Sequence, residues 1–357
     1  MPITAANAVL AKSRAMYGKR LTPQNIKDLV NCHNVSEVAA YLKSKTRYAK
    51  ALLNIEEGTV HRGQLENALR VKLFEDFASL CRYEMSRGDA FSEYAIIKGE
   101  IEQILHFLRL MMSGKPEEYI FFLPVFFAGR TSVDLYALSK VRTPKQFFSS
   151  MSGSRFGKAL APYAKDDKVE FTAIEQVLYH YLYKYLWRLI EHKATGREKK
   201  ELKELIGMRI DLLNFAHIYR LKRYFNMSPD EIKPFVFNTS QYLISAKILN
   251  SMIDAKTSDD VMEILLGKTF YKKYLDILDY TYVDSFVNRA AYRISKKCIR
   301  FSTFPSVVML SYIFLLETET EDVIKIIEGV RYKLPPEEIL SLISSGGMTS
   351  VRREGGS

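Results

Sequence analysis

Residues 265–275 read LLGKTFYKKYL, and residues 42–52 read LKSKTRYAKAL, so that one short pattern occurs twice at a constant offset of 223 residues. A weaker third copy, GSRFGKAL at residues 153–160, lies midway between them. Tyr48, Phe156 and Tyr271 are the corresponding aromatic residues of the three copies. Each copy follows a segment that begins with small polar residues suited to capping a helix, as Thr143 with Gln146 shows. We therefore expect each copy to be a short helix, a turn and a second short helix, and the whole chain to be an internal repeat.

Two further patterns support the same period. Pro-acid-Glu triplets begin at Pro116, Pro229 and Pro336, which suits the first turn of a helix. About 17 residues before each proline, an acid is followed three positions later by a polar residue. These pairs are Glu100/Gln103, Asp211/Asn214 and Glu319/Asp322. Because three such pairs stand at matched distances from the same cap, we interpret them as equivalent positions of three units.

The repeats predict three domains of about 110 residues, which cover residues 1–125, 126–236 and 237–345. That length exceeds the period of common helical solenoids, so each unit is expected to be a small domain. Apolar residues recur at helical spacing, and strand alternation and hairpin turns are scarce. The clearest stripes lie in residues 64–81, 176–190 and 206–221. We therefore predict an all-α fold, with residues 346–357 as a polar, mobile tail.

The composition is typical of a water-soluble globular protein. Apolar residues make up 47% of the 357 residues and charged residues 26%. The longest apolar runs have about ten residues, against the roughly 20 that a spanning helix needs. Three widely spaced cysteines and the absence of a signal-peptide pattern favour a cytosolic protein. The net charge of +11, interpreted as spread over the chain, makes an acidic partner plausible.

Several catalytic and binding motifs can be set aside. Gly267-Lys268-Thr269 resembles the end of a phosphate-binding loop, but Met262 stands where that loop requires a glycine. No two of the six histidines have metal-ligand spacing on a helix, so we predict no metal site. Glu100, Asp211 and Glu319 are expected to bond locally within their own units and not to form a carboxylate cluster. We predict no catalytic residue and no cofactor.

The aromatic stretch of residues 179–187, YHYLYKYLW, could stack nucleic-acid bases. Helical spacing instead places Leu178, Leu182 and Leu186 on a core stripe, with the tyrosines packed at its flanks. The basic run of residues 192–203 contains Glu198 and Glu201, and we interpret it as a solvated helix face. A helical adaptor or an RNA-binding protein remains the alternative function.

With these motifs placed, the chain resembles the C-type subunits of the prokaryotic A/V-type ATPases, a family that includes the d-type subunits of vacuolar ATPases. The resemblance extends over the whole length. It is carried by AKSRAMYGKRLT (11–22), SEVAAYLKSKTRYAKAL (36–52), RIDLLNFAHIYRLKRY (209–224), DDVMEILLGKTFYKKYL (259–275) and PSVVMLSYIFLLETETEDVIKIIEGVRYKLPPEEI (305–339). The last of these stretches is the most specific.

The resemblance implies a funnel of three similar helical domains around a central recess. It also implies a non-catalytic central-stalk protein on the cytoplasmic face of the membrane. Such a protein seats the D/F shaft of the rotor on the proteolipid ring and transmits torque for proton or sodium transport. Basic residues near the repeated motifs are the candidate partner contacts: Arg109, Arg220, Lys222, Arg223 and Arg331. The middle repeat departs from the pattern, since Ser154-Arg155-Phe156 replaces Thr-x-Tyr, and Asp322 stands where the other units have an amide.

Overall fold

The fold is all-α, as predicted. The computed structural model describes residues 2–345 except 57, 59, 86–90, 92, 124–128, 130, 166–168, 238–243, 269–270 and 272–282. Every regular element in this part of the chain is a helix, and no strand occurs in it. The predicted tail lies outside the described residues.

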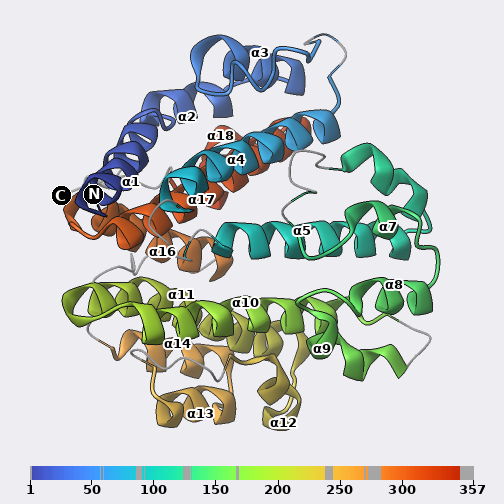
Figure 1. Cartoon of the computed structure of the whole chain (residues 1–357), viewed down its shortest axis with the longest axis vertical. Coiled ribbons are helices and arrows are strands. Elements are labelled where there is room, and N and C mark those ends of the chain that lie inside the picture. The colour runs from blue at the N-terminus through green and yellow to red at the C-terminus, as the bar shows by residue number, and fades with distance from the viewer. Residues whose placement is uncertain are drawn as a thin grey trace, which may run out of the picture.

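Three helical hairpins form the framework (Figure 1). Their helices are α4 (Arg62–Met85) with α5 (Glu93–Met112), α10 (Phe171–Lys193) with α11 (Gly196–Phe225), and α16 (Val283–Phe301) with α17 (Pro305–Arg331). After each hairpin comes a short helix whose first residue is the proline of a Pro-acid-Glu triplet. These are η2 (Pro116–Phe122), α12 (Pro229–Ile232) and α18 (Pro336–Leu342). The predicted helix starts are therefore confirmed.

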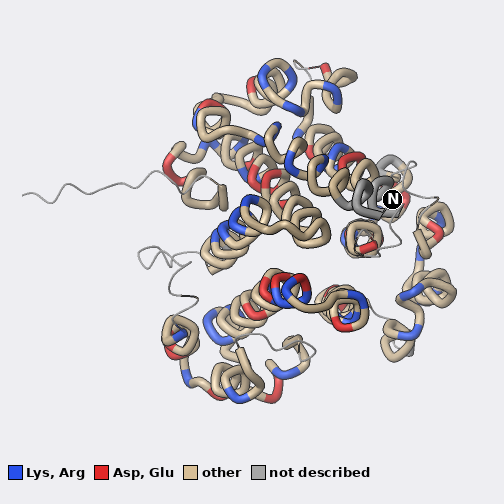
Figure 2. The backbone as a smooth tube through the Cα atoms, turned by 60° about the vertical axis from the view of Figure 1, so that its left-hand side comes forward, with Lys and Arg blue, Asp and Glu red and all other residues tan. Residues whose placement is uncertain are grey.

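The hairpins contact one another in cyclic order. Helix α5 packs against α10, α11 packs against α16, and α17 packs against α4. In Figure 1, α4, α17 and α18 lie in the upper half of the molecule, and α10 and α11 lie below α5. Figure 2 shows charged residues of both signs on many of the helices. The cyclic contacts agree with three related units, while the predicted funnel shape and domain limits stay predictions.

Further helices connect the hairpins and precede the first one. They are α1 (Pro2–Gly18), α2 (Pro23–Val30), α3 (Val35–Lys45), α7 (Leu135–Ser139), α8 (Pro144–Met151), α9 (Gly157–Leu160), η3 (Ala161–Lys165), η4 (Lys233–Phe235), α13 (Ala246–Asp254) and α14 (Ser258–Leu266). The expected caps are present: Asn34, Thr143 and Thr257 accept backbone N–H groups of the first turns of α3, α8 and α14. These side chains satisfy amides that would otherwise lack partners at the helix starts.

The second half of the repeated motif is only partly helical. In the middle copy it forms α9, as predicted. In the first copy, residues 47–54 form consecutive turns, so the prediction of a second helix is wrong there. Most of the third copy's second half lies outside the described residues. The turns of the first copy contain backbone hydrogen bonds such as Ala49 N–H to Thr46 O (3.3 Å). This bond joins residues three apart, as in a 3₁₀ turn and not as in an α-helix.

Each of the three repeated acids holds a segment that is distant in sequence. Glu319 on α17 accepts the backbone N–H of Leu21 at 2.8 Å, and Asp211 on α11 accepts that of Ile244 at 3.1 Å. Glu100 on α5 accepts the N–H of Ser132 in the same way. All three acids are at least nine-tenths buried. Buried carboxylates require such bonds, because an unsatisfied charge in the interior is costly.

The same acids also bind the repeated motif. The Tyr48 hydroxyl donates to Glu319 at 3.0 Å, and the Tyr271 hydroxyl donates to Asp211 at 2.7 Å. In the middle repeat Phe156 has no hydroxyl, and the preceding Arg155 forms an ion pair with Glu100 at 3.0 Å. The departure noted in the middle copy is therefore compensated, since a guanidinium takes the place of a phenol.

The polar residues three positions after the acids bind the short Pro-Glu helices or the chain that follows them. Asn214 exchanges two hydrogen bonds with the backbone of Phe237, at 2.7 and 3.0 Å. Asp322 accepts the N–H groups of Ser344 and Ser345, each at 2.8 Å. An acid suits this third unit because both of its partners are donors. Gln103 accepts the hydroxyl of Tyr119 at 3.0 Å.

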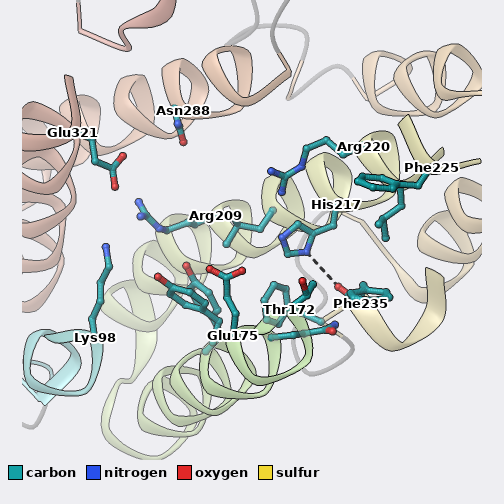
Figure 3. A pocket seen from close by; sticks show the side chains of 16 residues that line it. Lys98, Thr172, Glu175, Arg209, His217, Arg220, Phe225, Phe235, Asn288 and Glu321 are labelled. Carbon is teal, nitrogen blue, oxygen red and sulfur yellow. Dashed lines mark hydrogen bonds between the residues drawn. The ribbon is translucent and has the colours of Figure 1, made fainter. Parts of the chain in front are cut away.

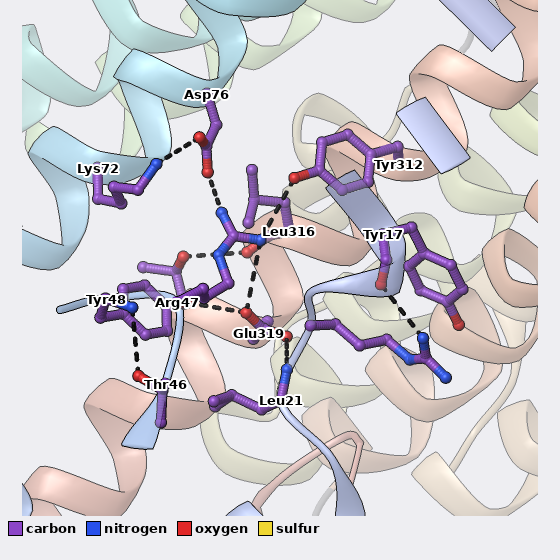
Figure 4. A network of polar contacts seen from close by, with 12 residues as sticks. Tyr17, Leu21, Thr46, Arg47, Tyr48, Lys72, Asp76, Tyr312, Leu316 and Glu319 are labelled. Carbon is purple, nitrogen blue, oxygen red and sulfur yellow. Dashed lines mark hydrogen bonds and ion pairs between the residues drawn. The ribbon is translucent and has the colours of Figure 1, made fainter. Parts of the chain in front are cut away.

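The first motif joins the beginning of the chain to its end (Figure 4). Besides Tyr48, Arg47 reaches α17 and α4, where it donates to the Tyr312 hydroxyl at 3.3 Å and pairs with Asp76. A separate apolar core lies between these parts of the chain. It contains Leu29, Val38 and Leu42 with Ile326, Ile327 and Ile339. The N-terminal segment therefore completes the unit built on α17.

We predict that Gly329→Ala destabilises the protein by about 1–3 kcal/mol. A Cβ at Gly329 would lie 2.6 Å from Cγ1 of Ile339, which is fully buried where α18 packs on α17. Chemical denaturation measures the change. Gly63→Ala on α4 is the control, because a Cβ there meets no atom within 4 Å. Equal stability of the two variants would contradict the predicted close packing.

Candidate functional site

The three long helices α5, α11 and α17 meet at one buried ion cluster. Lys98, Arg209 and Glu317 stand two residues before the anchors Glu100, Asp211 and Glu319, so they are equivalent positions of the three repeats. The Lys98 Nζ lies 2.7 Å from Glu317 Oε2, and the Arg209 Nη2 lies 3.4 Å from the same oxygen. The equivalent positions of the three helices thus meet at one carboxylate.

Aromatic rings surround this cluster. The Tyr94 hydroxyl is 3.4 Å from Glu317 Oε1, and the Arg209 guanidinium lies over the ring of Phe314 at 4.3 Å. Burial opposes the charge of Lys98, but Glu317 and other neighbours outweigh it and raise the pKa of Lys98 well above its usual range. Glu317 pairs with both cations, and Lys98 also pairs with Glu102 at 3.7 Å.

A recess extends from the cluster along the inner faces of the long helices (Figure 3). It consists of two hollows, of about 510 and 490 Å³, which share Tyr179 and Glu321 in their linings. Equivalent residues of α5 and α11 follow one another along the walls at helical spacing. They are Glu102, His106 and Arg109 on α5, and Leu213, His217 and Arg220 on α11. Figure 3 shows Lys98, Arg209, Glu175 and Glu321 directed toward one space.

The recess combines basic and acidic walls. Arg109 and Arg220 extend from α5 and α11, and Glu175 of α10 is influenced by both of them. Burial raises the pKa of Glu175, although the two guanidinium groups act in the opposite direction. Glu321 of α17 faces them from the third long helix. A partner that enters would therefore meet cations from two walls and a carboxylate from the third.

One histidine in the recess is neutral over most of the pH range. Burial lowers the pKa of His106 to about 4, and Arg109 and Arg70 act in the same direction. The imidazole of His217, at the equivalent position of α11, contacts the carbonyl oxygen of Phe235 through Nδ1 at 3.2 Å.

The five basic residues predicted as contacts fall into two groups. Arg109 and Arg220 line the recess. Lys222 is buried and donates to the Ala255 carbonyl at 2.6 Å, so its ammonium group connects α11 to the chain after α13. Arg223 and Arg331 are exposed near the ends of α11 and α17, where Arg331 stacks on Tyr332. Their contact roles stay predictions.

The described residues contain no group of three or more His, Cys, Asp or Glu that could hold a metal ion. The expectation that Glu100, Asp211 and Glu319 bond locally within their own units is wrong. Their partners Ser132, Ile244 and Leu21 each lie in another predicted unit. Lys268 follows the end of α14, and the residues directly after it lie outside the described part of the chain. Tyr271 is fully buried.

Comparison with known proteins gives one family. A family model described as ATP synthase (C/AC39) subunit matches residues 9–342. The chain is 23% identical over 343 residues to the C-type subunit of the A-type ATP synthase of Pyrococcus horikoshii, an alignment that covers 93% of this chain and 88% of the relative. It is 26% identical over 270 residues to the C-type subunit of the A-type ATP synthase of Methanosphaera stadtmanae, with 74% of this chain and 64% of the relative covered.

We predict that Glu317→Gln lowers the free energy of unfolding by about 3 kcal/mol or more, because Lys98 and Arg209 would lose the charge that compensates them. Thermal and chemical denaturation measure the loss. Glu118→Gln removes the same charge from an exposed pair with Lys115, and we expect a change within about 0.5 kcal/mol. A Glu317→Gln variant as stable as the control would show that the ion cluster does not hold the helices together.

His106 predicts a pH dependence of stability. Its pKa is about 4 in the folded protein and about 6.5 in the unfolded chain, so the unfolded chain binds more protons between these values. The free energy of unfolding should fall by about 2 kcal/mol from pH 6.5 to pH 4 because of this residue alone. Chemical denaturation across this range should give a smaller decrease for His106→Gln than for the original chain. His33→Gln, at an exposed position, should follow the original chain.

Proposed function

We propose that this chain, which belongs to the ATP synthase (C/AC39) subunit family, is a non-catalytic central-stalk component of a rotary A/V-type ATPase. It seats the D/F shaft in the central recess and connects it to the membrane proteolipid ring. Torque then passes through it for proton or sodium transport. The family match over residues 9–342 and the central recess among three equivalent helices carry this proposal.

The recess has the chemistry of a protein contact. Its walls carry Arg109, Arg220, Glu175 and Glu321, together with the exposed ring of Phe225 at the end of α11. Mixed charges around a concave surface guide a charged partner and fix its orientation more than they raise affinity. An inserted shaft tip would therefore be held in a defined rotational position.

The interior suits the transmission of torque. The three long helices are tied together by the ion cluster at Glu317, and each is tied to a flanking segment by its own buried acid. Closely packed interiors resist deformation. A twist applied in the recess would thus turn the whole body.

The position that we propose is peripheral, on the cytoplasmic face of the membrane. Within the described ranges, no helix combines the length and the apolar character that crossing a bilayer requires. Contact with the membrane would then occur through the proteolipid ring.

A pull-down from host membranes tests the assignment. The tagged chain should recover the D/F shaft and the proteolipid ring, identified by mass. Isolation of the chain without either partner would contradict the proposal.

The recess can be tested separately with purified D/F shaft. We predict that Arg109→Glu combined with Arg220→Glu weakens shaft binding about tenfold or more, because it reverses the charge on two walls. Lys145→Glu, which lies exposed on α8, should bind as the original chain does. If the recess and α8 variants weaken binding equally, the recess is not the shaft seat.

A further inference from the structure

Two segments that lack acidic residues account for most of the net positive charge of the chain. Residues 1–27 and residues 285–316 contain ten Lys and Arg and no Asp or Glu, so they account for ten of the eleven net charges. The expectation that the excess charge is spread over the chain is therefore wrong. The two segments include α1, most of α16 and the first half of α17, and α1 and α16 both pack against α17.

A second cavity, of about 590 Å³, lies where these segments meet. Its lining includes the end of α1, the start of α2, one face of α16 and the middle of α17. Five Lys and Arg line it, but Glu319 is its only lining carboxylate among the described residues. This cavity shares no lining residue with the central recess.

Glu319 does not neutralise the cavity as a whole. Its oxygens accept the Leu21 N–H and the Tyr48 hydroxyl, and its charge faces Arg47 at 3.9 Å (Figure 4). Arg47 is held in turn by Asp76 and Tyr312. Glu319 and Arg47 thus form part of the wall, and the positive charge of the cavity comes from other residues.

Three of those residues are Arg20, Lys296 and Arg300. The guanidinium of Arg20 lies over the ring of Tyr17 at 4.2 Å, and the ammonium of Lys296 lies 5.6 Å from the ring of Tyr292. Burial lowers the pKa of Lys296, and the charges of Arg300, Arg20 and Arg293 lower it further. Like charges gathered in a partly buried site repel one another, and a bound anion would relieve that repulsion.

The hydroxyl of Tyr17 gives an independent indication of a ligand. Tyr17 lines the cavity and is 8% exposed, and its buried hydroxyl has no hydrogen-bond partner among the described residues. An unsatisfied buried hydroxyl costs about 1–3 kcal/mol, so such groups are rare without a role. A phosphate oxygen would accept a hydrogen bond from the Tyr17 hydroxyl.

The remaining lining is apolar. Leu21, Ile26, Leu315 and Leu316 contribute aliphatic side chains, and Tyr312 contributes an aromatic ring. A volume of about 590 Å³ is in the range of small-molecule sites. The cavity therefore offers cations for an anionic group and apolar walls for the body to which that group is attached.

We propose that this cavity binds an organic phosphate, with the phosphate held by Arg20, Lys296, Arg300 and the Tyr17 hydroxyl, and an apolar or aromatic body against Leu315 and Leu316. Both a soluble nucleotide and the headgroup of an anionic phospholipid have this chemistry. The site is separate from the central recess, and the proposal does not depend on the rotor function.

Isothermal titration calorimetry of the full chain in phosphate-free, low-salt buffer tests the site. The probes are AMP, dihexanoyl phosphatidic acid below its micelle concentration, and inorganic phosphate. We expect AMP or phosphatidic acid to bind saturably, at least tenfold more tightly than inorganic phosphate. Tighter binding of AMP identifies a soluble aromatic ligand, and tighter binding of phosphatidic acid identifies a lipid. Absence of saturable binding by both organic probes, or equal binding of inorganic phosphate, overturns the proposal.

Variants locate the binding. Lys296→Gln combined with Arg300→Gln should weaken the better probe about tenfold or more, since charge-assisted hydrogen bonds are lost. Lys297→Gln is the matched control, because Lys297 pairs with Glu204 at 3.3 Å and does not line the cavity. If Lys297→Gln weakens binding as much as the double variant does, the probe is not bound in this cavity.

Tyr17→Phe separates binding from folding. It removes a buried hydroxyl without a described partner, so the melting temperature should stay the same or rise. Binding of the organic probe should nevertheless weaken severalfold, because one donor to the phosphate is lost. Unchanged affinity in this variant, or a loss of affinity accompanied by unfolding, counts against the assigned role of the hydroxyl.

Discussion

The structure depends on three buried carboxylates that cannot remain without partners. Glu100, Asp211 and Glu319 lie inside long helices, where removal from water is tolerated only if each receives hydrogen bonds or an opposite charge. Each obtains them from a segment outside its own helix. The need of each buried carboxylate for hydrogen-bond donors therefore fixes where the segment that supplies them docks. The same relation holds in all three repeats. Burial raises the pKa of Glu100 and of Glu319, because it disfavours the charged form of a carboxyl group.

The recess beside the ion cluster follows from the same geometry. With the anchors directed toward their segments, the residues two positions earlier point to the centre, where Lys98 and Arg209 meet Glu317. Four positions after these residues, Glu102, Leu213 and Glu321 line the recess. The repeat thus produces both the closed ion cluster and the open space beside it. The three equivalent positions at the cluster carry two cations, Lys98 and Arg209, and one carboxylate, Glu317. The opposite charge of Glu317 is what allows the three helices to meet there.

Much of this could be predicted from the sequence because the signals are local. Helix caps such as Thr143, apolar stripes such as that of α4, and the Pro-acid-Glu starts depend on neighbouring residues only. The ion cluster could not be predicted in the same way, since equivalent positions carry Lys, Arg and Glu and show no common residue type. The one shared feature of these three positions is that each lies two residues before a repeated acid. The second half of the first motif was misjudged for a related reason, because Tyr48 and Leu52 are fixed by burial in the surrounding structure and not by helix propensity.

The contact between the N-terminal motif and α17 has a consequence for how the protein is made. Leu21 and Tyr48 leave the ribosome first, but their partner Glu319 is synthesised about 270 to 300 residues later. Domains generally fold in order as the chain emerges. The first sixty residues must therefore wait, with the apolar side chains around Leu29 and Leu42 uncovered, until the last helices arrive. The contact between the N-terminal segment and α17 can then form only after the last helices are synthesised. A chain truncated before α17 lacks the partner against which its N-terminal segment packs.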